Sequence, residues 1–176
     1  KQSVPGGYTL SAFTDADYAT NSDRKSISAC TIHLNGMLVH WYCTKQSNIS
    51  LSTMESEFVA AARGVQELLG CYEVLKEIGC PLKLPMTLHM DNQAAIVQVT
   101  SEASTQRSKH IDIKYKFLKD LYLKRIVNPV HVPTQSMLAD LMTKALPTPD
   151  FRRLFSMIGL EDARKKEDTH RGGVLE

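Results

Sequence analysis

Cysteine is scarce in this sequence, and the cysteines present form no recognisable framework. The four are Cys30, Cys43, Cys71 and Cys80, and no two of them are spaced as a Cys-x-x-Cys pair. No pair of histidines completes a zinc-binding pattern with them. This argues against a disulfide-stapled domain and against a structural zinc site. Because their neighbours are apolar, we expect four small buried thiols in a reducing compartment.

Long hydrophobic runs are also missing. No apolar run approaches the roughly 20 residues that a membrane-spanning helix needs. The first seven residues contain no apolar segment of the kind that opens a signal peptide. We therefore expect a soluble, cytoplasmic protein that makes no use of a membrane. The start at Lys1 rather than at a methionine favours a piece of a longer protein.

A strong overall charge is the third absence, because the formal net charge of the 176 residues is only +2. Any affinity for nucleic acid must then come from local clusters of basic residues. The length and the 43% of hydrophobic residues suit one domain with a short appendage. We expect a linker at 1–7, one monomeric domain at 8–160, and a charged, disordered tail at 161–176.

The first third of the chain reads as a three-stranded antiparallel meander. Alternating apolar residues predict strands at 8–15, 26–34 and 37–45, with Trp41 in the core. Asn35-Gly36 separates the last two strands and is the strongest short hairpin signal, since both turn positions need a positive φ.

The rest of the chain alternates helices with single strands. Apolar residues at helical spacing predict a helix at 53–78. A strand at 84–90, a short helix at 92–99, a polar loop at 101–108, a helix at 109–125 and a strand at 126–132 are expected next. Helices at 135–145 and 151–158 follow. The order predicts an α/β fold with a five-stranded mixed sheet and helices packed on it, a fold in which sites gather at the carboxyl ends of strands.

Two aspartates stand where such a site is expected. Asp15 and Asp91 each follow apolar residues at the predicted end of a strand. A carboxylate there loses water, which is costly unless a cation compensates, and hard ions such as Mg²⁺ choose oxygen ligands. The alternative is that each aspartate only caps a turn or helix. Two acids on adjacent strand ends favour the metal site.

A helical glutamate can complete this cluster. Glu55 and Glu57 both lie in the first turns of the predicted helix, and their angular positions around its axis do not separate them. Glu55 is the third residue after Ser52 and fits a capping box, which gives it a structural task. We therefore assign Glu57, which precedes the apolar Phe58, to the site.

Asp140 is the second helical acid. It stands among apolar residues, where an unpaired charge is costly. Lys144 one turn later or a bound metal ion would each explain it, and the residues alone leave both explanations open.

Six motifs follow one another across residues 8–160. They are Asp15-Ala16-Asp17-Tyr18-Ala19, Asp23-Arg24-Lys25-Ser26, Ser52-Thr53-Met54-Glu55-Ser56-Glu57-Phe58, Asp91-Asn92-Gln93-Ala94-Ala95-Ile96, Lys109-His110-Ile111-Asp112-Ile113 and Leu138-Ala139-Asp140-Leu141-Met142-Thr143-Lys144. In this order they resemble the ribonuclease H domain of the Pol polyproteins of copia-type long-terminal-repeat retrotransposons.

The resemblance implies a ribonuclease H-like fold with Asp15, Glu57, Asp91 and Asp140 as catalytic and metal-binding residues. It implies two Mg²⁺ ions roughly 3.5–4 Å apart, for which Mn²⁺ can substitute. The implied reaction is hydrolysis of the RNA strand of RNA–DNA hybrids during reverse transcription, leaving 5′-phosphate and 3′-hydroxyl ends. The implied partner is a reverse transcriptase domain upstream, and the implied location is the cytoplasm or a retrotransposon particle.

The sequence departs from the family at two places. Ala29 stands where a glycine is common, and Val132-Pro133-Thr134 occupies the loop in which many ribonucleases H carry a mobile histidine. We therefore expect no catalytic histidine, with His131 placed in the strand. Two alternatives stay open: a domesticated, non-catalytic domain that binds nucleic acid or protein, and a DNA strand-transfer enzyme, which the helix position of Glu57 disfavours.

Substrate contacts are predicted at seven residues near the strand ends or within the motifs. They are Arg24, Lys25, Ser26, Asn92, Gln93, Lys109 and His110. The basic side chains would contact phosphates, which predicts strong salt dependence. Asn92 and Gln93 would bond the minor groove of the hybrid, or Asn92 would only cap a helix.

Overall fold

The computed structural model describes residues 6–101 and 109–161, and of residues 109–111 it describes only the backbone. The predicted tail therefore lies almost wholly outside the described residues, as does most of the predicted linker. Its strands are β1 Leu10–Asp17, β2 Ile27–Leu34, β3 Met37–Lys45, β4 Met86–Met90 and β5 Val127–His131. Its helices are α1 Thr53–Glu77, α2 Gln93–Thr100, α3 Lys109–Leu123, the single 3-10 turn Thr134–Ser136, α4 Asp140–Thr143 and α5 Thr148–Met157.

The five strands form one mixed sheet in the order β3-β2-β1-β4-β5. The first three are antiparallel neighbours, while β4 runs parallel to β1 and β5 runs parallel to β4. Asn35 and Gly36 have φ values of 49° and 83°, as the hairpin between β2 and β3 requires. The predicted α/β fold class and the predicted meander are confirmed.

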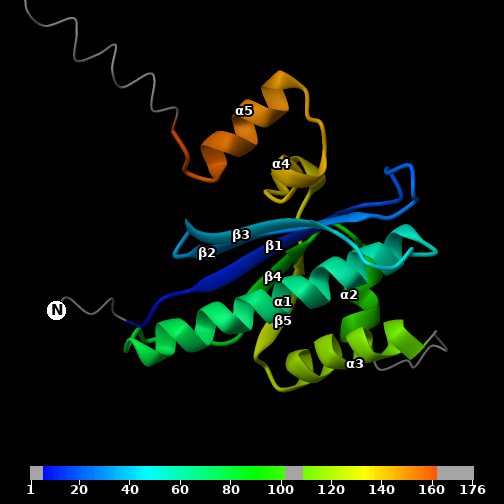
Figure 1. Ribbon diagram of the computed structural model, residues 1–176. Helices are drawn as coiled ribbons and strands as arrows, with labels where there is room; N and C mark the ends of the chain where they lie inside the picture. Colours follow the sequence, from blue (N-terminus) through cyan, green and yellow to red (C-terminus); the bar gives the residue numbers. More distant parts are fainter. Residues whose placement is uncertain (1–5, 102–108, 162–176) are drawn as a thin grey trace, which may run out of the picture.

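Helices cover both faces of this sheet. Figure 1 shows α1, α2 and α3 on one face and α4 with α5 on the other. The main core lies between the sheet and α1 to α3, where Phe58, Val65 and Leu88 are almost completely buried. A smaller apolar cluster of Leu138, Leu154 and Ile158 lies under α5. The sheet is therefore held from both sides.

A glycine lets α1 approach the sheet closely. Gly64 is buried, and a Cβ atom on it would lie 2.3 Å from Cγ2 of Thr14 in β1 and 3.3 Å from Sγ of Cys30 in β2. Gly64 lies seven residues after Glu57, which is two helical turns, so the two residues share one face of α1. The close approach therefore also presses Glu57 against β1.

Most predicted elements lie within three residues of their expected bounds, but the helix predicted at 135–145 is wrong. A 3-10 turn and the four-residue α4 replace it. Met137, Leu138 and Ala139 are all buried, as is Asp140 after them. One helix lying on a sheet buries a single face, so four consecutive buried residues require a break.

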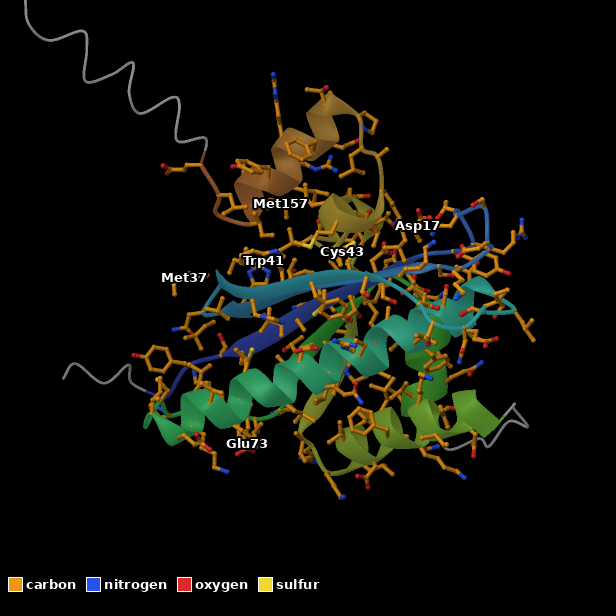
Figure 2. The ribbon with its side chains drawn as sticks, in the orientation of Figure 1. Asp17, Met37, Trp41, Cys43, Glu73 and Met157 are labelled. Atoms are coloured by element: carbon orange, nitrogen blue, oxygen red, sulfur yellow. The ribbon has the colours of Figure 1, made fainter. Side chains whose placement is uncertain are left out.

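Two expectations about side chains are also wrong. Trp41 is 60% exposed rather than part of the core, and Cys43 is exposed while Cys71 and Cys80 are partly exposed. Figure 2 shows Trp41 and Cys43 on the side of the sheet where α4 and α5 lie. Because β3 is an edge strand, these side chains have a neighbouring strand on one side only. Among the described helices, none is long and apolar enough to cross a membrane.

Candidate metal centre

The first two acids lie side by side at one edge of the sheet. β1 and β4 pair in parallel up to Phe13 and His89, so Asp15 and Asp91 each come two residues beyond the last pair. Asp15 was predicted to end its strand, but β1 continues along β2 to Asp17, so this part of the prediction is wrong. Asp15 nevertheless lies beyond the end of β4. Asp15 is 1% exposed, and Asp91 is half-buried.

The third acid comes from the start of α1. Ser52 caps this helix by accepting a hydrogen bond from the amide of Glu55 at 3.1 Å, and the Glu55 carboxylate accepts one from the amide of Leu51 at 2.9 Å. The predicted capping role of Glu55 is thereby confirmed. Glu57 is buried instead, and its Oε1 accepts a hydrogen bond from the amide of Ala16 at 3.2 Å. Glu57 is thus fixed to β1 directly beside Asp15.

We call Asp15, Glu57 and Asp91 the acidic trio. One carboxylate oxygen from each lies within 4.8 Å of the other two. The second oxygen of Glu57, Oε2, is buried and has no hydrogen-bond partner. A buried carboxylate oxygen without a donor is costly unless a cation meets it. The trio therefore fits a hard divalent ion such as Mg²⁺, which prefers carboxylate ligands.

Two acids of the trio have raised pKa values. Burial, together with the neighbouring Asp15 and Asp91 carboxylates, raises the pKa of Glu57 to about 9. Burial and Asp15 also raise the pKa of Asp91. A bound divalent ion would favour the ionised forms of Glu57 and Asp91 and reverse these shifts.

The fourth acid, Asp140, has a cationic partner within the protein. It opens the short α4, is buried, and its Oδ1 accepts a hydrogen bond from Nζ of Lys144 at 2.8 Å. Burial raises the pKa of Asp140 despite this contact. Burial lowers the pKa of Lys144, but its hydrogen bonds with Asp140 and Asp15 more than offset this and hold that pKa above its ordinary value. The ion pair with Lys144, one of the two explanations left open for Asp140, is therefore present, and metal binding at Asp140 stays a prediction.

Two threonines contact the acids and were not singled out from the sequence. The hydroxyl of Thr143 donates a hydrogen bond to Oδ2 of Asp15, and that of Thr134 donates one to Oδ2 of Asp91 at 3.4 Å. Thr143 belongs to the sixth motif, which could have pointed to it. Thr134 lies in the loop Val132-Pro133-Thr134, which departs from the family pattern, and no local pattern marks it. His131, at the end of β5, is exposed.

The predicted substrate residues occupy varied positions. Arg24 is exposed at a φ of 58° in the loop after β1, whereas Ser26 is completely buried and its hydroxyl accepts a hydrogen bond from the amide of Ala19. Asn92 caps α2 by accepting from the amide of Ala95 at 3.0 Å, and Gln93 beside it is exposed.

Lys25 is partly exposed in the same loop as Arg24. The side chains of Lys109 and His110 lie outside the described residues. Ser26 therefore has a structural task in the loop, while the other substrate contacts stay predictions.

Comparisons with known proteins agree with this arrangement, although no protein-family model matches the chain. The retrovirus-related Pol polyprotein from transposon RE1 of Arabidopsis thaliana is 31% identical over 157 residues, which cover 88% of this chain. The corresponding polyprotein from transposon TNT 1-94 of Nicotiana tabacum is 28% identical over 152 residues, or 86% of this chain. The chain spans only 11% of the length of each.

Solved structures show the same fold. The crystal structure of LC11-RNase H1 in complex with an RNA/DNA hybrid matches with a TM-score of 0.59 at 14% identity, covering 76% of this chain and 93% of that one. At this identity the likeness establishes the fold. The chain is thus similar to a segment of retrotransposon Pol polyproteins and has a ribonuclease H-like fold, in line with the family that the six motifs resemble.

Proposed function

We propose that this chain is an endonuclease that hydrolyses the RNA strand of RNA–DNA hybrids at the acidic trio and Asp140, with two divalent metal ions. The observation that carries the proposal is the buried Oε2 of Glu57, which no donor meets although two further carboxylates lie beside it. A purely structural cluster would pair such an oxygen with a hydrogen-bond donor. A cluster that receives cations leaves it open.

The chemistry follows from where the side chains are held. Bound Mg²⁺, or Mn²⁺ in its place, would supply the charge that activates a water molecule and stabilises the leaving 3′ oxygen, giving 5′-phosphate and 3′-hydroxyl ends. Asp15 lies in β1 and Asp91 directly follows the neighbouring β4, so their spacing is set by the sheet. Glu57 is fixed by the amide of Ala16, and Asp15 by the hydroxyl of Thr143. Such preorganised ligands need little rearrangement when charge develops at phosphorus.

The choice of substrate is supported by the relatives. The solved structure of LC11-RNase H1 holds an RNA/DNA hybrid, and the sequence relatives are retrovirus-related Pol polyproteins. We therefore propose that this domain acts during reverse transcription, beside a reverse transcriptase domain of a longer parent in the cytoplasm. Phosphate or base contacts are offered by Arg24 and Lys25, which form part of the second motif, and by Gln93, which lies two residues after Asp91.

The test compares cleavage of four end-labelled substrates: an RNA–DNA hybrid, an RNA duplex, a DNA duplex and single-stranded RNA. We expect Mg²⁺-dependent cleavage of the RNA strand of the hybrid only, and its loss in Asp91→Asn. Glu73→Gln is the matched control, because Glu73 is exposed and lies 16 residues beyond Glu57, or about 24 Å along α1. Figure 2 shows it on the side of α1 away from the sheet.

Two results would count against the proposal. No cleavage with either Mg²⁺ or Mn²⁺, while the hybrid is still bound, would favour a non-catalytic binding domain. Cleavage that survives Asp91→Asn would move the reaction away from the acidic trio.

A further inference from the structure

The ammonium group of Lys144 lies between two buried carboxylates. Its Nζ is 2.8 Å from Oδ1 of Asp140 and 3.2 Å from Oδ1 of Asp15. The two aspartate side chains are 4% and 1% exposed, whereas that of Lys144 is 33% exposed. Charge-assisted hydrogen bonds to desolvated carboxylates are strong, so this cation is firmly held.

Asp15 belongs to two clusters at once. It contributes to the acidic trio, in which Asp140 takes no part, and it also shares the ammonium of Lys144 with Asp140. A two-ion centre needs two cation positions roughly 3.5–4 Å apart, with a carboxylate close to both. The trio offers one such position. The space between Asp15 and Asp140 offers the other, and the ammonium of Lys144 already lies there.

We propose that Lys144 fills the second cation position of the metal-free protein, and that the second divalent ion enters only by displacing it. The inference rests on the proposed metal-dependent function. Lys144 neutralises Asp15 and Asp140 while no metal is bound. The first ion then binds the acidic trio, and the second binds more weakly because two ammonium contacts must break.

The local structure allows this exchange without unfolding. Lys144 directly follows α4 as its C-terminal cap, and its amide donates a hydrogen bond to the carbonyl of Asp140 at 3.1 Å, which holds its backbone. Its partly exposed side chain has a path to solvent. The hydroxyl of Thr143 keeps its own hydrogen bond to Asp15 and can hold that carboxylate when the ammonium leaves.

The test measures Mn²⁺ binding by calorimetry in the absence of nucleic acid. The variants are Lys144→Met, which removes the charge, and Lys144→Arg, which keeps it. Lys124→Met is the matched control, because Lys124 also pairs with an aspartate four residues earlier, Asp120 at 2.7 Å, but on the exposed surface of the α3 end. Thermal unfolding of each protein, in chelator and in Mn²⁺, provides a second reading.

We expect Lys144→Met to bind the second ion about tenfold or more tightly than the unmodified protein, because no ammonium has to leave. Its melting temperature should fall in chelator and recover in Mn²⁺ by more than that of the unmodified protein. Lys144→Arg and Lys124→Met should bind the second ion no more tightly than the unmodified protein. If Lys144→Met does not fold in chelator, Lys144→Gln, which also removes the charge, replaces it.

Three outcomes would overturn the inference. An unchanged or weakened second binding step in Lys144→Met, with the first step intact, would refute the role of Lys144 and leave the proposed function standing. Equal tightening in Lys124→Met would show a general effect of net charge. Failure of every protein to bind Mn²⁺ would refute the metal centre itself.

Discussion

The two helical acids of the site come from contrasting regions. Glu57 stands on α1, a helix of 25 residues with a capping box, and one of its oxygens has no partner. Asp140 stands on α4, a helix of four residues, and the ammonium of Lys144 meets it directly. One half of the site is thus rigid and short of positive charge, while the other is a brief segment with its own cation. If the site takes two metal ions, as we propose, this contrast predicts that the two positions differ in how readily metal enters.

The largest expected effect is on cleavage, where both halves should be needed. We expect Glu57→Gln and Asp140→Asn each to slow hybrid cleavage by about 10²–10³-fold, because each removes a charged ligand from the reacting centre. Glu55→Gln is the control, since glutamine can also complete a capping box. Initial rates in saturating Mg²⁺ measure the effect. A Glu57→Gln variant as fast as the unmodified protein would remove the rigid half from the site.

In the absence of metal, ionisation of the buried Glu57 should lower the free energy of unfolding as pH rises. Its pKa is about 9 in the folded protein against an ordinary 4.5, so in the unfolded chain it ionises at much lower pH. Stability in chelator should therefore fall as pH rises from about 4.5 to 9, by about 3 kcal/mol at pH 7. Glu57→Gln should lack this loss. The melting temperatures of the two proteins in chelator should diverge as pH rises through this window, and parallel curves would contradict the account.

The close approach of α1 to the sheet should have a smaller effect. Gly64→Ala would force a Cβ to within 2.3 Å of Thr14 and should cost about 1–3 kcal/mol of stability. Gly70→Ala, in the same helix with no atom within 4 Å of the added Cβ, should instead stabilise by about 0.5–1 kcal/mol. Chemical denaturation measures both. Equal effects of the two substitutions would show that the rigid half does not depend on this contact.

The contrast between α1 and α4 also explains which parts of the site could be predicted from the sequence. The capping box and the apolar spacing that define α1 are local, so the separation of Glu55 from Glu57 followed from neighbouring residues alone. The break before α4 depends on how residues 137–140 are buried under the other face of the sheet, and the contact of Lys144 with Asp15 spans 129 positions. Neither leaves a local pattern. The parallel pairing that brings Asp15 beside Asp91 was expected only from the general rule for such sheets.

A crystal structure of the protein grown with Mn²⁺, examined by anomalous scattering, tests the central claim most directly. We expect a manganese peak in contact with Asp15, Glu57 and Asp91, with Oε2 of Glu57 among its ligands. A second peak, where present, should lie between Asp15 and Asp140, with Lys144 turned away. No peak at saturating Mn²⁺, with the three carboxylates arranged as they are here, would contradict the assignment of a metal centre.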